Sequence, residues 1–332
     1  MDVNSIKEYL GDSWTAAMEV LYSSLKSDIK LLDDTNRRVL SKPGKQLRPV
    51  ICLLVARLCG NGKITEGSIR CAAASELLHN ATLLHDDVAD DSASRRGIPT
   101  VMSLLGGRSS VLLGDFWLVK AMDNILLSGK EGDRLIRIFA RTLSDLAEGE
   151  ILQLEKSISC DTGEEDYLRI IFSKTASLFE AAACAGAISA GATEQQAEAV
   201  KAYARNLGMA FQIKDDILDY YGDERIGKPV GMDLKEQKIT LPLLGAFINA
   251  GAESEREVRR KVSEIPSHPE YVDEISVFVK ENRGVEYAQE RLSGYVDKAV
   301  SSLDIFPDTE DCRLLKSLAL FVAERNSYNL IP

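Results

Sequence analysis

Apolar residues recur along this 332-residue chain at the spacing of helix faces. Positions of the type i, i+3, i+4 and i+7 predict helices over residues 69–84, 111–127, 133–158, 166–189 and 195–221. No sustained alternation with a period of two occurs, so the pattern predicts no sheet. No proline lies between Pro99 and Pro229, and because proline breaks helix interiors its absence permits long helices there. We therefore predict an all-α fold.

Residues typical of helix starts flank some of these segments. Thr193 with Gln196, and Ser267 with Glu270, have the spacing of a capping box. We find no repeat of solenoid period and no low-complexity linker. We therefore expect a single domain over residues 1–332.

Composition narrows the possible classes of function. The 51 Asp and Glu residues outnumber the 40 Lys and Arg residues, which gives a formal charge of −11. This argues against general nucleic-acid binding, because that requires a basic face. The six cysteines form no Cys-x-x-Cys pair, so we expect reduced, buried thiols.

Neither the N-terminus nor the most apolar stretch has the pattern of a membrane or secretion signal. The longest nearly apolar run, residues 181–192, is too short to span a bilayer. The first ten residues contain no basic segment followed by an apolar one. We therefore expect a cytoplasmic protein with no transmembrane segment, which could still act on a lipid substrate.

An aspartate cluster ends the predicted helix over residues 69–84. Asp86 and Asp90 are four residues apart and therefore share a helix face, and Asp87 lies between them. Like charges at this spacing, at the negative end of the helix dipole, destabilise the helix unless a cation compensates them. Carboxylates of this kind suit Mg²⁺, which takes a few protein oxygens together with waters and substrate phosphates.

A second cluster repeats this spacing. Asp215, Asp216 and Asp219 lie in another apolar helix, again with two carboxylates on one face. One such cluster is readily explained as solvated surface, but two identical spacings favour a pair of metal sites. An EF-hand does not fit, because its loop alternates ligands around a glycine and closes with a glutamate.

Basic residues occur near both clusters. They are Lys45, Arg48, Arg95, Arg96, Lys174, Lys228 and Lys238. Each one alone is typical of a surface ion pair that contributes little. Together they favour two diphosphate sites, one reached through metal and one held directly by guanidinium and ammonium groups.

The two motifs, Asp-Asp-Val-Ala-Asp over 86–90 and Asp-Asp-Ile-Leu-Asp over 215–219, resemble those of the trans-isoprenyl diphosphate synthases, the polyprenyl synthetase family. Segments 44–49 and 227–242 also resemble this family, in the same order. Segments 79–87 and 147–154 are most similar to bacterial octaprenyl diphosphate synthases.

This resemblance implies an isoprenoid-synthase-type bundle of antiparallel helices around a central cavity, usually in a homodimer. It implies Mg²⁺-dependent head-to-tail condensation of isopentenyl diphosphate with geranyl, farnesyl or geranylgeranyl diphosphate. The allylic C–O bond ionises, the double bond of isopentenyl diphosphate attacks C1, and a proton is lost to the departing diphosphate. His85 beside Asp86 is an alternative base, although a packing or hydrogen-bonding role is favoured.

The resemblance also assigns roles to matching residues. The metal ligands are Asp86, Asp87, Asp90, Asp215 and Asp219, with Asp216 nearby. The contacts to the allylic diphosphate are Arg95, Lys174, Thr175, Gln212, Lys228 and Lys238, and those to isopentenyl diphosphate are Lys45, Arg48, His79 and Arg96. The six aspartates, Lys174 and Lys238 are expected to be catalytic.

Small residues before the first cluster bear on product length. Thr82 and Ala81 lie four and five residues before Asp86, about one helical turn or 5.4 Å away. Relatives that stop at C15 often have an aromatic residue at one of these positions. We therefore expect a long all-trans product of about C40, within roughly C30 to C50. The length of one isoprene unit is close to the rise of one helical turn, about 5.4 Å.

Four alternatives remain open. A C15–C20 synthase shares the same motifs. A terpene cyclase usually carries an Asn/Ser/Glu pattern in place of Asp215–Asp219. A non-catalytic subunit of a heteromeric synthase commonly lacks one or both aspartate motifs, and an acidic helical scaffold predicts no Mg²⁺-dependent turnover. Exact product length, primer, end use and oligomeric state are not determined by these residues.

Overall fold

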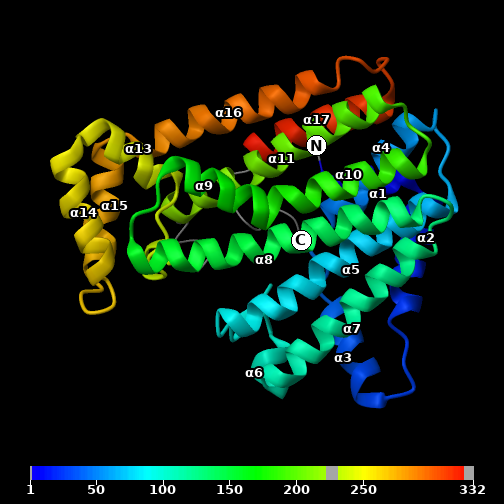
Figure 1. The fold of residues 1–332 in the computed structure, drawn as a ribbon, viewed down its shortest axis with the longest axis horizontal. Coiled ribbons are helices and arrows are strands. Elements are labelled where there is room, and N and C mark those ends of the chain that lie inside the picture. Colours follow the sequence, from blue (N-terminus) through cyan, green and yellow to red (C-terminus); the bar gives the residue numbers. More distant parts are fainter. Residues whose placement is uncertain (1, 222–230, 325–332) are drawn as a thin grey trace. The chain divides into compact units, whose positions relative to one another are not determined.

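The computed structural model describes residues 2–221 and 231–324. Within them the chain is helical over most of its length, which confirms the all-α prediction (Figure 1). Helices occupy every segment that the apolar periodicity predicted: α5 (Glu66–Ala89), α7 (Gly107–Leu126), α8 (Gly132–Ser159), the continuous run of α9 (Glu164–Ile171), the π-helical turn η1 (Phe172–Ala176) and α10 (Ser177–Ser189), and α11 (Glu194–Tyr221).

The chain forms two compact units, each assembled from segments far apart in sequence. Unit 1 consists of Met1–Ala140, Ala181–Lys201 and Ile305–Leu315. Unit 2 consists of Arg141–Glu180, Ala202–Asp304 and Lys316–Pro332. Helices α8, α10, α11 and α17 (Glu310–Glu324) each contribute residues to both units.

Unit 1 has an apolar core centred on one helix. Besides α5 and α7 it contains α1 (Val3–Leu10), α2 (Asp12–Ser24), α3 (Lys30–Leu40), α4 (Leu47–Cys59) and α6 (Val101–Leu105). Helix α4 is apolar on nearly all sides and almost entirely buried, so it forms the centre of this core. Helix α5 packs against α2 and α4 and runs side by side with α7 (Figure 1).

A very short hairpin follows α5. Strands β1 (Ser94–Arg95) and β2 (Ile98–Pro99) pair antiparallel, and the turn between them is formed by Arg96 and Gly97 with φ of 52° and 76°. Two consecutive positive φ values are typical of turns that match strand twist. The apolar pattern predicts no strand here, because strands of two residues are too short to show alternation. The hairpin carries two arginines of the predicted site.

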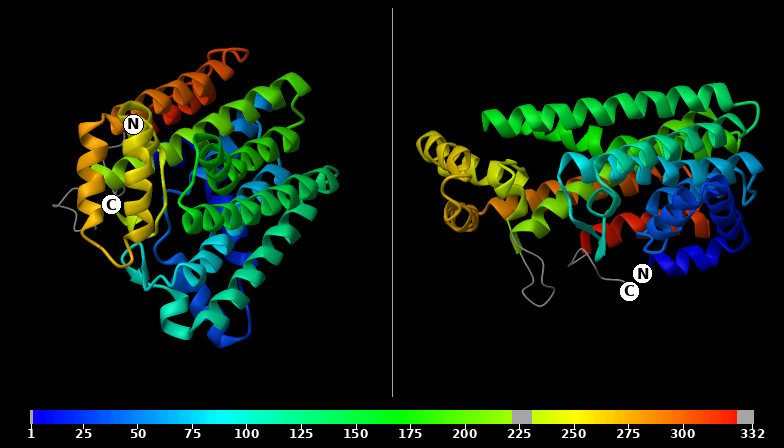
Figure 2. Two further views of the ribbon diagram at one scale, coloured as in Figure 1. Left: turned by 60° about the vertical axis from the view of Figure 1, so that its left-hand side comes forward. Right: turned by 90° about the horizontal axis from the view of Figure 1, so that it is seen from below.

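Unit 2 contains a second set of helices. Besides α9 and η1 these are α12 (Met232–Lys235), α13 (Leu241–Ala250), α14 (Ala252–Glu264), α15 (Tyr271–Glu281) and α16 (Gly284–Ser302). Helix α13 packs along α16, and α14 and α15 lie next to each other (Figure 2). Helix α14 is strongly charged but buries Val258 and Val262, so its apolar face packs inward.

One of the two predicted capping boxes is present. At the start of α11, the N–H of Gln196 donates to Oγ1 of Thr193 at 3.3 Å, and the N–H of Thr193 donates to Oε1 of Gln196 at 2.9 Å. The predicted box of Ser267 and Glu270 is wrong. The N–H of Ser267 bonds to the carbonyl of Glu264 in the turn that ends α14, so Ser267 does not stand at a helix start.

The helical run from Glu164 to Ser189 is long and apolar enough to cross a membrane by length and composition alone. However, 78% of its most apolar window is buried inside the protein, which is typical of a core helix. The six cysteines are free thiols, as predicted, and four of them are buried.

Candidate active site

In unit 1, the first aspartate cluster forms the C-terminal end of α5. The N–H of Asp90 donates to the carbonyl of Asp86 at 2.8 Å, so the two residues still follow the helical ladder and share one face. Asp86 is half-buried and Asp90 is exposed. Among the described residues, no Lys or Arg pairs with Asp90. Its carboxylate therefore lies at the negative end of the helix dipole without a cation from the described part of the protein.

The middle aspartate of this cluster has a different partner. Asp87 is 4% exposed, and Nε of Arg95 donates to its Oδ1 at 2.7 Å. The sequence assigned Asp87 to metal and Arg95 to the allylic diphosphate, whereas the structure pairs them with each other. This ion pair joins β1 to the end of α5 and so fixes the hairpin that carries Arg96.

The residues assigned to isopentenyl diphosphate come together in unit 1. Nζ of Lys45 and Nε of Arg48 are both buried, and Nη1 of Arg96 donates to the carbonyl of Lys42 at 3.3 Å. Burial, together with nearby guanidinium groups of which Arg48 has the largest effect, holds the pKa of His79 well below 6.5. His79 is therefore neutral at pH 7 and donates from only one ring nitrogen.

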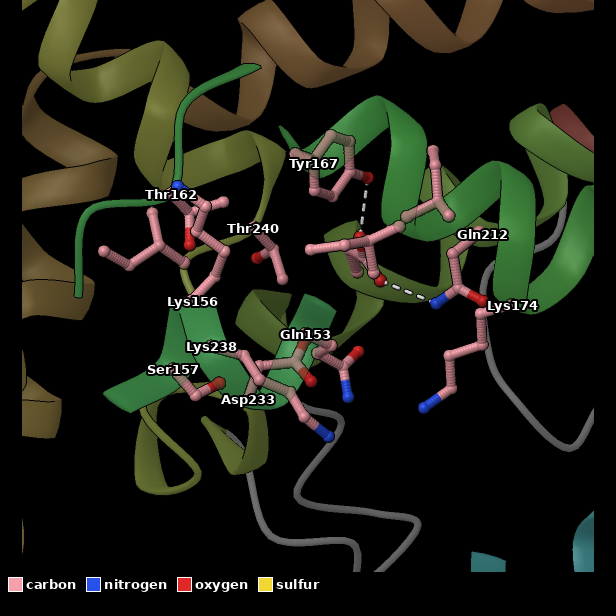
Figure 3. Close-up of a pocket in the computed structure, with 14 residues that line it drawn as sticks. Gln153, Lys156, Ser157, Thr162, Tyr167, Lys174, Gln212, Asp233, Lys238 and Thr240 are labelled. Atoms are coloured by element: carbon pink, nitrogen blue, oxygen red, sulfur yellow. Dashed lines mark hydrogen bonds between the residues drawn. The ribbon is translucent and has the colours of Figure 1, made fainter. Parts of the chain in front are cut away.

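In unit 2, four side chains form a hydrogen-bonded chain around the second aspartate cluster, and Figure 3 shows the two bonds made by Tyr167 and Gln212. Tyr167 donates to Oδ2 of Asp216 at 2.6 Å, and Nε2 of Gln212 donates to Oδ1 of Asp216 at 2.8 Å. Thr175 in turn donates to Oε1 of Gln212 at 2.7 Å. Both oxygens of Asp216 thus accept hydrogen bonds within the protein, and the amide of Gln212 is fixed at both ends.

A cavity of about 90 Å³ lies beside this chain (Figure 3). Its polar lining includes Tyr167, Lys174, Gln212, Asp216, Asp233 and Lys238. The ammonium group of Lys174 pairs with Oε1 of Glu150 at 2.7 Å, and that of Lys238 pairs with Glu236. Three lysines, Lys156, Lys174 and Lys238, and two carboxylates therefore line one cavity, as expected of a site for a metal-bound diphosphate.

Local backbone geometry places Lys174 and Thr175. Both lie in η1, a single π-helical turn of a kind often found at functional sites. Helix α11 approaches this turn closely, because a β-carbon on Gly208 would lie 2.5 Å from Cα of Ala176. Glycine at position 208 therefore lets α11, which carries Gln212 and Asp216, reach η1 at hydrogen-bonding distance.

Asp219 has a structural task that the sequence did not predict. Its Oδ1 accepts from the N–H of Met232 at 3.2 Å, and its Oδ2 accepts from the N–H of Asp233 at 3.0 Å. These are the first backbone donors of α12, so Asp219 acts as a helix cap supplied from α11. It thereby fixes the segment that carries Asp233 and Lys238.

The predicted site residues fall into two groups. Unit 1 holds Lys45, Arg48, His79, Ala81, Thr82, Asp86, Asp87, Asp90, Arg95 and Arg96, and unit 2 holds Lys174, Thr175, Gln212, Asp215, Asp216, Asp219 and Lys238. Lys228 lies outside the described residues. Sequence reasoning missed Tyr167, Asp233 and Glu150. Asp233 lay in the segment that resembled the family, whereas a lone Tyr167 carries no local signal.

The donor sets fit a hard divalent cation. Within the described ranges, no three or more His, Cys, Asp or Glu side chains are grouped closely enough to hold a metal by themselves. The carboxylates of Asp86, Asp90 and Asp215 nevertheless offer only oxygen donors. Few protein oxygens, completed by waters and substrate phosphates, are what Mg²⁺ prefers.

Comparison with known proteins agrees with this chemistry. A family model described as Polyprenyl synthetase matches residues 29–279. The chain is 38% identical over 329 residues to the octaprenyl diphosphate synthase of Haemophilus influenzae, covering 98% of each chain.

Solved structures give the same result. The decaprenyl diphosphate synthase of Rhodobacter capsulatus matches with a TM-score of 0.90 and 34% identity, covering 98% of this chain and 99% of that one. A polyprenyl synthase of Caulobacter crescentus CB15, complexed with calcium and isoprenyl diphosphate, matches with a TM-score of 0.88 and 33% identity over 98% of both chains. The family match and the extent of these similarities together show that the chain belongs to the polyprenyl synthetase family.

Proposed function

We propose that this chain is a trans-prenyltransferase that condenses isopentenyl diphosphate with an allylic diphosphate and makes a long all-trans product of about C40, since one turn of the helix along which the tail would extend is close in length to one isoprene unit. Its family and its octaprenyl and decaprenyl relatives support this reaction. One observation carries the proposal: each unit holds an aspartate motif together with basic side chains that suit a diphosphate.

Three aspartates are the proposed metal ligands. Asp86 and Asp90 bind Mg²⁺ in unit 1, and Asp215 binds it in unit 2, while Asp87 and Asp219 hold these segments in place. Magnesium, when bound, neutralises charge on the leaving diphosphate. Charge repulsion between Asp86 and Asp90 at the end of α5 supports this assignment, because it requires a cation.

The basic residues divide between the two substrates. Lys174 and Lys238, together with Lys228, which lies outside the described residues, bind the allylic diphosphate and stabilise it as the C–O bond breaks. Their present partners, Glu150 and Glu236, give way to the substrate's phosphates. Lys45, Arg48, neutral His79 and Arg96 bind isopentenyl diphosphate. The departing diphosphate takes the proton, so no protein base is needed.

Both units are needed for turnover in this proposal, so the whole chain acts as one polyprenyl synthetase domain. We also propose a homodimer in the cytoplasm. The largely buried Glu164–Ser189 run supports a chain that does not insert into a membrane.

The test is a turnover assay with labelled isopentenyl diphosphate, a C15 primer and Mg²⁺. We expect products near C40, and a loss of several orders of magnitude in Asp86→Ala and Asp215→Ala with the fold retained. Products of C15–C20 would indicate a short-chain synthase, and a cyclic hydrocarbon would indicate a terpene cyclase. No turnover would indicate either a subunit that needs a partner or a scaffold without catalytic activity. Near-normal turnover in either variant would contradict the assignment of that aspartate as a metal ligand.

A further inference from the structure

Gln237 directly precedes Lys238 in unit 2 and has a backbone conformation that is unusual for a glutamine. Its φ is 57°, in the left-handed region that favours glycine. The residue follows the C-cap of α12, at the position where helices commonly end in this conformation. Strain of this kind persists where surrounding contacts hold the residue in place, and it is often found at functional sites.

The left-handed turn fixes the backbone of Lys238. The N–H of Gln237 donates to the carbonyl of Leu234 at 2.9 Å. The N–H of Lys238 donates to the carbonyl of Asp233 at 2.8 Å. These two bonds form a Schellman motif, which requires a left-handed residue directly after the C-cap. The backbone of Lys238 is therefore tied to α12 through a turn that depends on the conformation of Gln237.

The side chain of Gln237 anchors this turn to another helix. Its Nε2 donates to the carbonyls of Val262 and Ser263, both at 3.2 Å. These carbonyls belong to the last turn of α14, where the regular helical ladder supplies no donors for the final four carbonyls. The amide group carries two N–H bonds, so one side chain can serve both acceptors.

Helix α14 is itself fixed, because Arg259 ties it to the loop that follows α8. Nη1 of Arg259 donates to the carbonyl of Cys160 at 2.9 Å, and Nη2 donates to that of Thr162 at 3.0 Å. Thr162 and Lys238 both line the cavity shown in Figure 3. One helix thus holds two separate segments of the cavity wall, one through Arg259 and the other through Gln237.

We propose that Gln237 is a positioning residue for Lys238, because its amide holds the left-handed turn against the end of α14 and so keeps the ammonium group of Lys238 at the cavity. The inference rests on the proposed function, which assigns Lys238 to the allylic diphosphate. Gln237 is not among the described residues that line the cavity, so it acts through Lys238 and not by contact with the substrate.

The test compares the kinetics of Gln237→Glu and Gln237→Gly with those of the unaltered enzyme. An ionised glutamate has the same length but no donor for the two carbonyls, and glycine removes the anchor altogether. We expect kcat/KM for the C15 primer to fall by about tenfold in both variants, because a small displacement of a group that stabilises the leaving diphosphate is costly. KM for isopentenyl diphosphate should change by less than about twofold, since its proposed site does not include Lys238.

Gln237→Ala separates the effect of the anchor from that of backbone strain. Alanine and glycine lose the same hydrogen bonds, but only alanine keeps the strain of a left-handed residue. Gln237→Ala should therefore be less stable than Gln237→Gly in urea unfolding, with a similar loss of kcat/KM for the primer. An unaltered kcat/KM in Gln237→Gly would overturn the inference, because the conformation of the turn alone would then place Lys238.

Asn249→Ala is the matched control. Nδ2 of Asn249 also donates to a carbonyl at a helix end of unit 2, that of Asn282 at 2.8 Å, but Asn249 is not among the described residues that line the cavity. Its removal should lower thermal stability and leave both kinetic constants unchanged. An equal loss of kcat/KM in Asn249→Ala and Gln237→Gly would show general destabilisation only, and would count against a positioning role.

A binding measurement and a double-mutant cycle test the link to Lys238. Calorimetry with an unreactive C15 thiodiphosphate analogue should show weaker binding to Gln237→Glu, independently of turnover. If Gln237 acts through Lys238, Gln237→Glu should have little further effect in a Lys238→Ala background. Unchanged binding or full additivity would contradict the inference. If Lys238→Ala alone leaves kcat/KM for the primer unchanged, the proposed role of Lys238 in the allylic site is wrong.

Discussion

Tyr167 donates its phenolic O–H to Oδ2 of Asp216 at 2.6 Å, and both side chains are buried in unit 2. Burial raises the pKa of Asp216 well above its usual value, and the nearby carboxylate of Asp233 raises it further. The hydrogen bonds from Tyr167 and Gln212 act in the opposite direction. These two donors therefore fix the orientation of a carboxylate that directly follows Asp215, the proposed metal ligand.

Tyr167→Phe is expected to lower both stability and turnover. It leaves a buried acceptor without its donor, which typically costs about 1–3 kcal/mol. The release of Asp216 should also disturb Asp215 and reduce kcat. Urea unfolding and steady-state kinetics measure the two effects.

A matched control variant separates the effect on stability from the effect on turnover. Tyr287 also donates to a carboxylate of unit 2, Oε2 of Glu164, at 2.7 Å, but it does not line the cavity. Tyr287→Phe should therefore lose stability without losing kcat. An equal loss of kcat in both variants would show that Tyr167 acts only through general stability.

Asp219 and Asp215 are expected to respond differently to substitution. Asp219→Ala removes the cap of α12, which should cost about 1 kcal/mol of stability and lower kcat through the segment that carries Lys238. Asp219→Asn keeps one acceptor oxygen and should retain more activity. Asp215→Asn should be nearly as inactive as Asp215→Ala, because an amide is a poor ligand for Mg²⁺.

Magnesium titration of the same variants gives the second readout. The Mg²⁺ concentration for half-maximal rate should rise for substitutions at Asp215 and stay close to that of the unaltered enzyme for Asp219→Ala. A rise at Asp219 as large as at Asp215 would return Asp219 to the metal ligands.

The sequence was sufficient for features that depend on neighbouring residues. The 3.6-residue period predicted the long helices, and Thr193 with Gln196 predicted the start of α11. The aspartate spacing predicted the charged end of α5. Each of these features depends on residues within one or two helical turns, so a short stretch of sequence is enough to predict it.

Other parts of the site depend on contacts that no local pattern contains. Tyr167 and Asp216 are 49 residues apart, so nothing in either segment indicates their hydrogen bond. The pairing of Asp87 with Arg95 depends on the hairpin turn, whose two-residue strands are too short to predict.

The imidazole of His85 leaves no room for a side chain at Gly114. A β-carbon there would lie 2.4 Å from Nε2 of His85, which also contacts Oδ1 of Asp115 at 3.2 Å. Gly114→Ala should therefore displace the ring or push α7 away from α5, which should lower the free energy of unfolding by about 1–3 kcal/mol. Because Asp86 follows His85 directly, kcat should fall as well.

The ring itself provides the control for this prediction. In a His85→Ala background the clash is absent, so adding Gly114→Ala should cost little further stability or activity. Thermal melts and kinetics of the four proteins measure this coupling. Additive effects would show that the two residues do not act on each other.

His79 should make stability depend on pH in a defined direction. Its pKa in the folded protein is well below 6.5, so the unfolded chain takes up a proton more readily as pH falls through 6.5. The free energy of unfolding should therefore fall between pH 7.5 and 5.5 through this residue. The difference between the unaltered protein and His79→Gln in urea unfolding isolates this contribution, and an identical pH dependence of the two would refute a neutral His79.

The last prediction concerns product length. Ala81 is 1% exposed in α5, and Thr82 turns its hydroxyl back onto the carbonyl of His79 at 2.8 Å. Both are small, so a tail proposed to extend from Asp86 along the helix, by about 5.4 Å per turn, would meet no bulky side chain at these two positions.

Ala81→Phe should place a ring across that path and shorten the product from about C40 to C15–C20, since roughly one turn separates Ala81 from the metal site. Ala81→Leu is smaller and should give products of intermediate length. The rate of the first condensation onto a C10 primer should be retained in both variants, because the diphosphate sites lie beyond the ring, and this rate separates a blocked path from a damaged fold. Thin-layer sizing of labelled products measures the outcome. A C40 product from Ala81→Phe would place the growing chain elsewhere, because a tail confined along this face of α5 has to pass position 81.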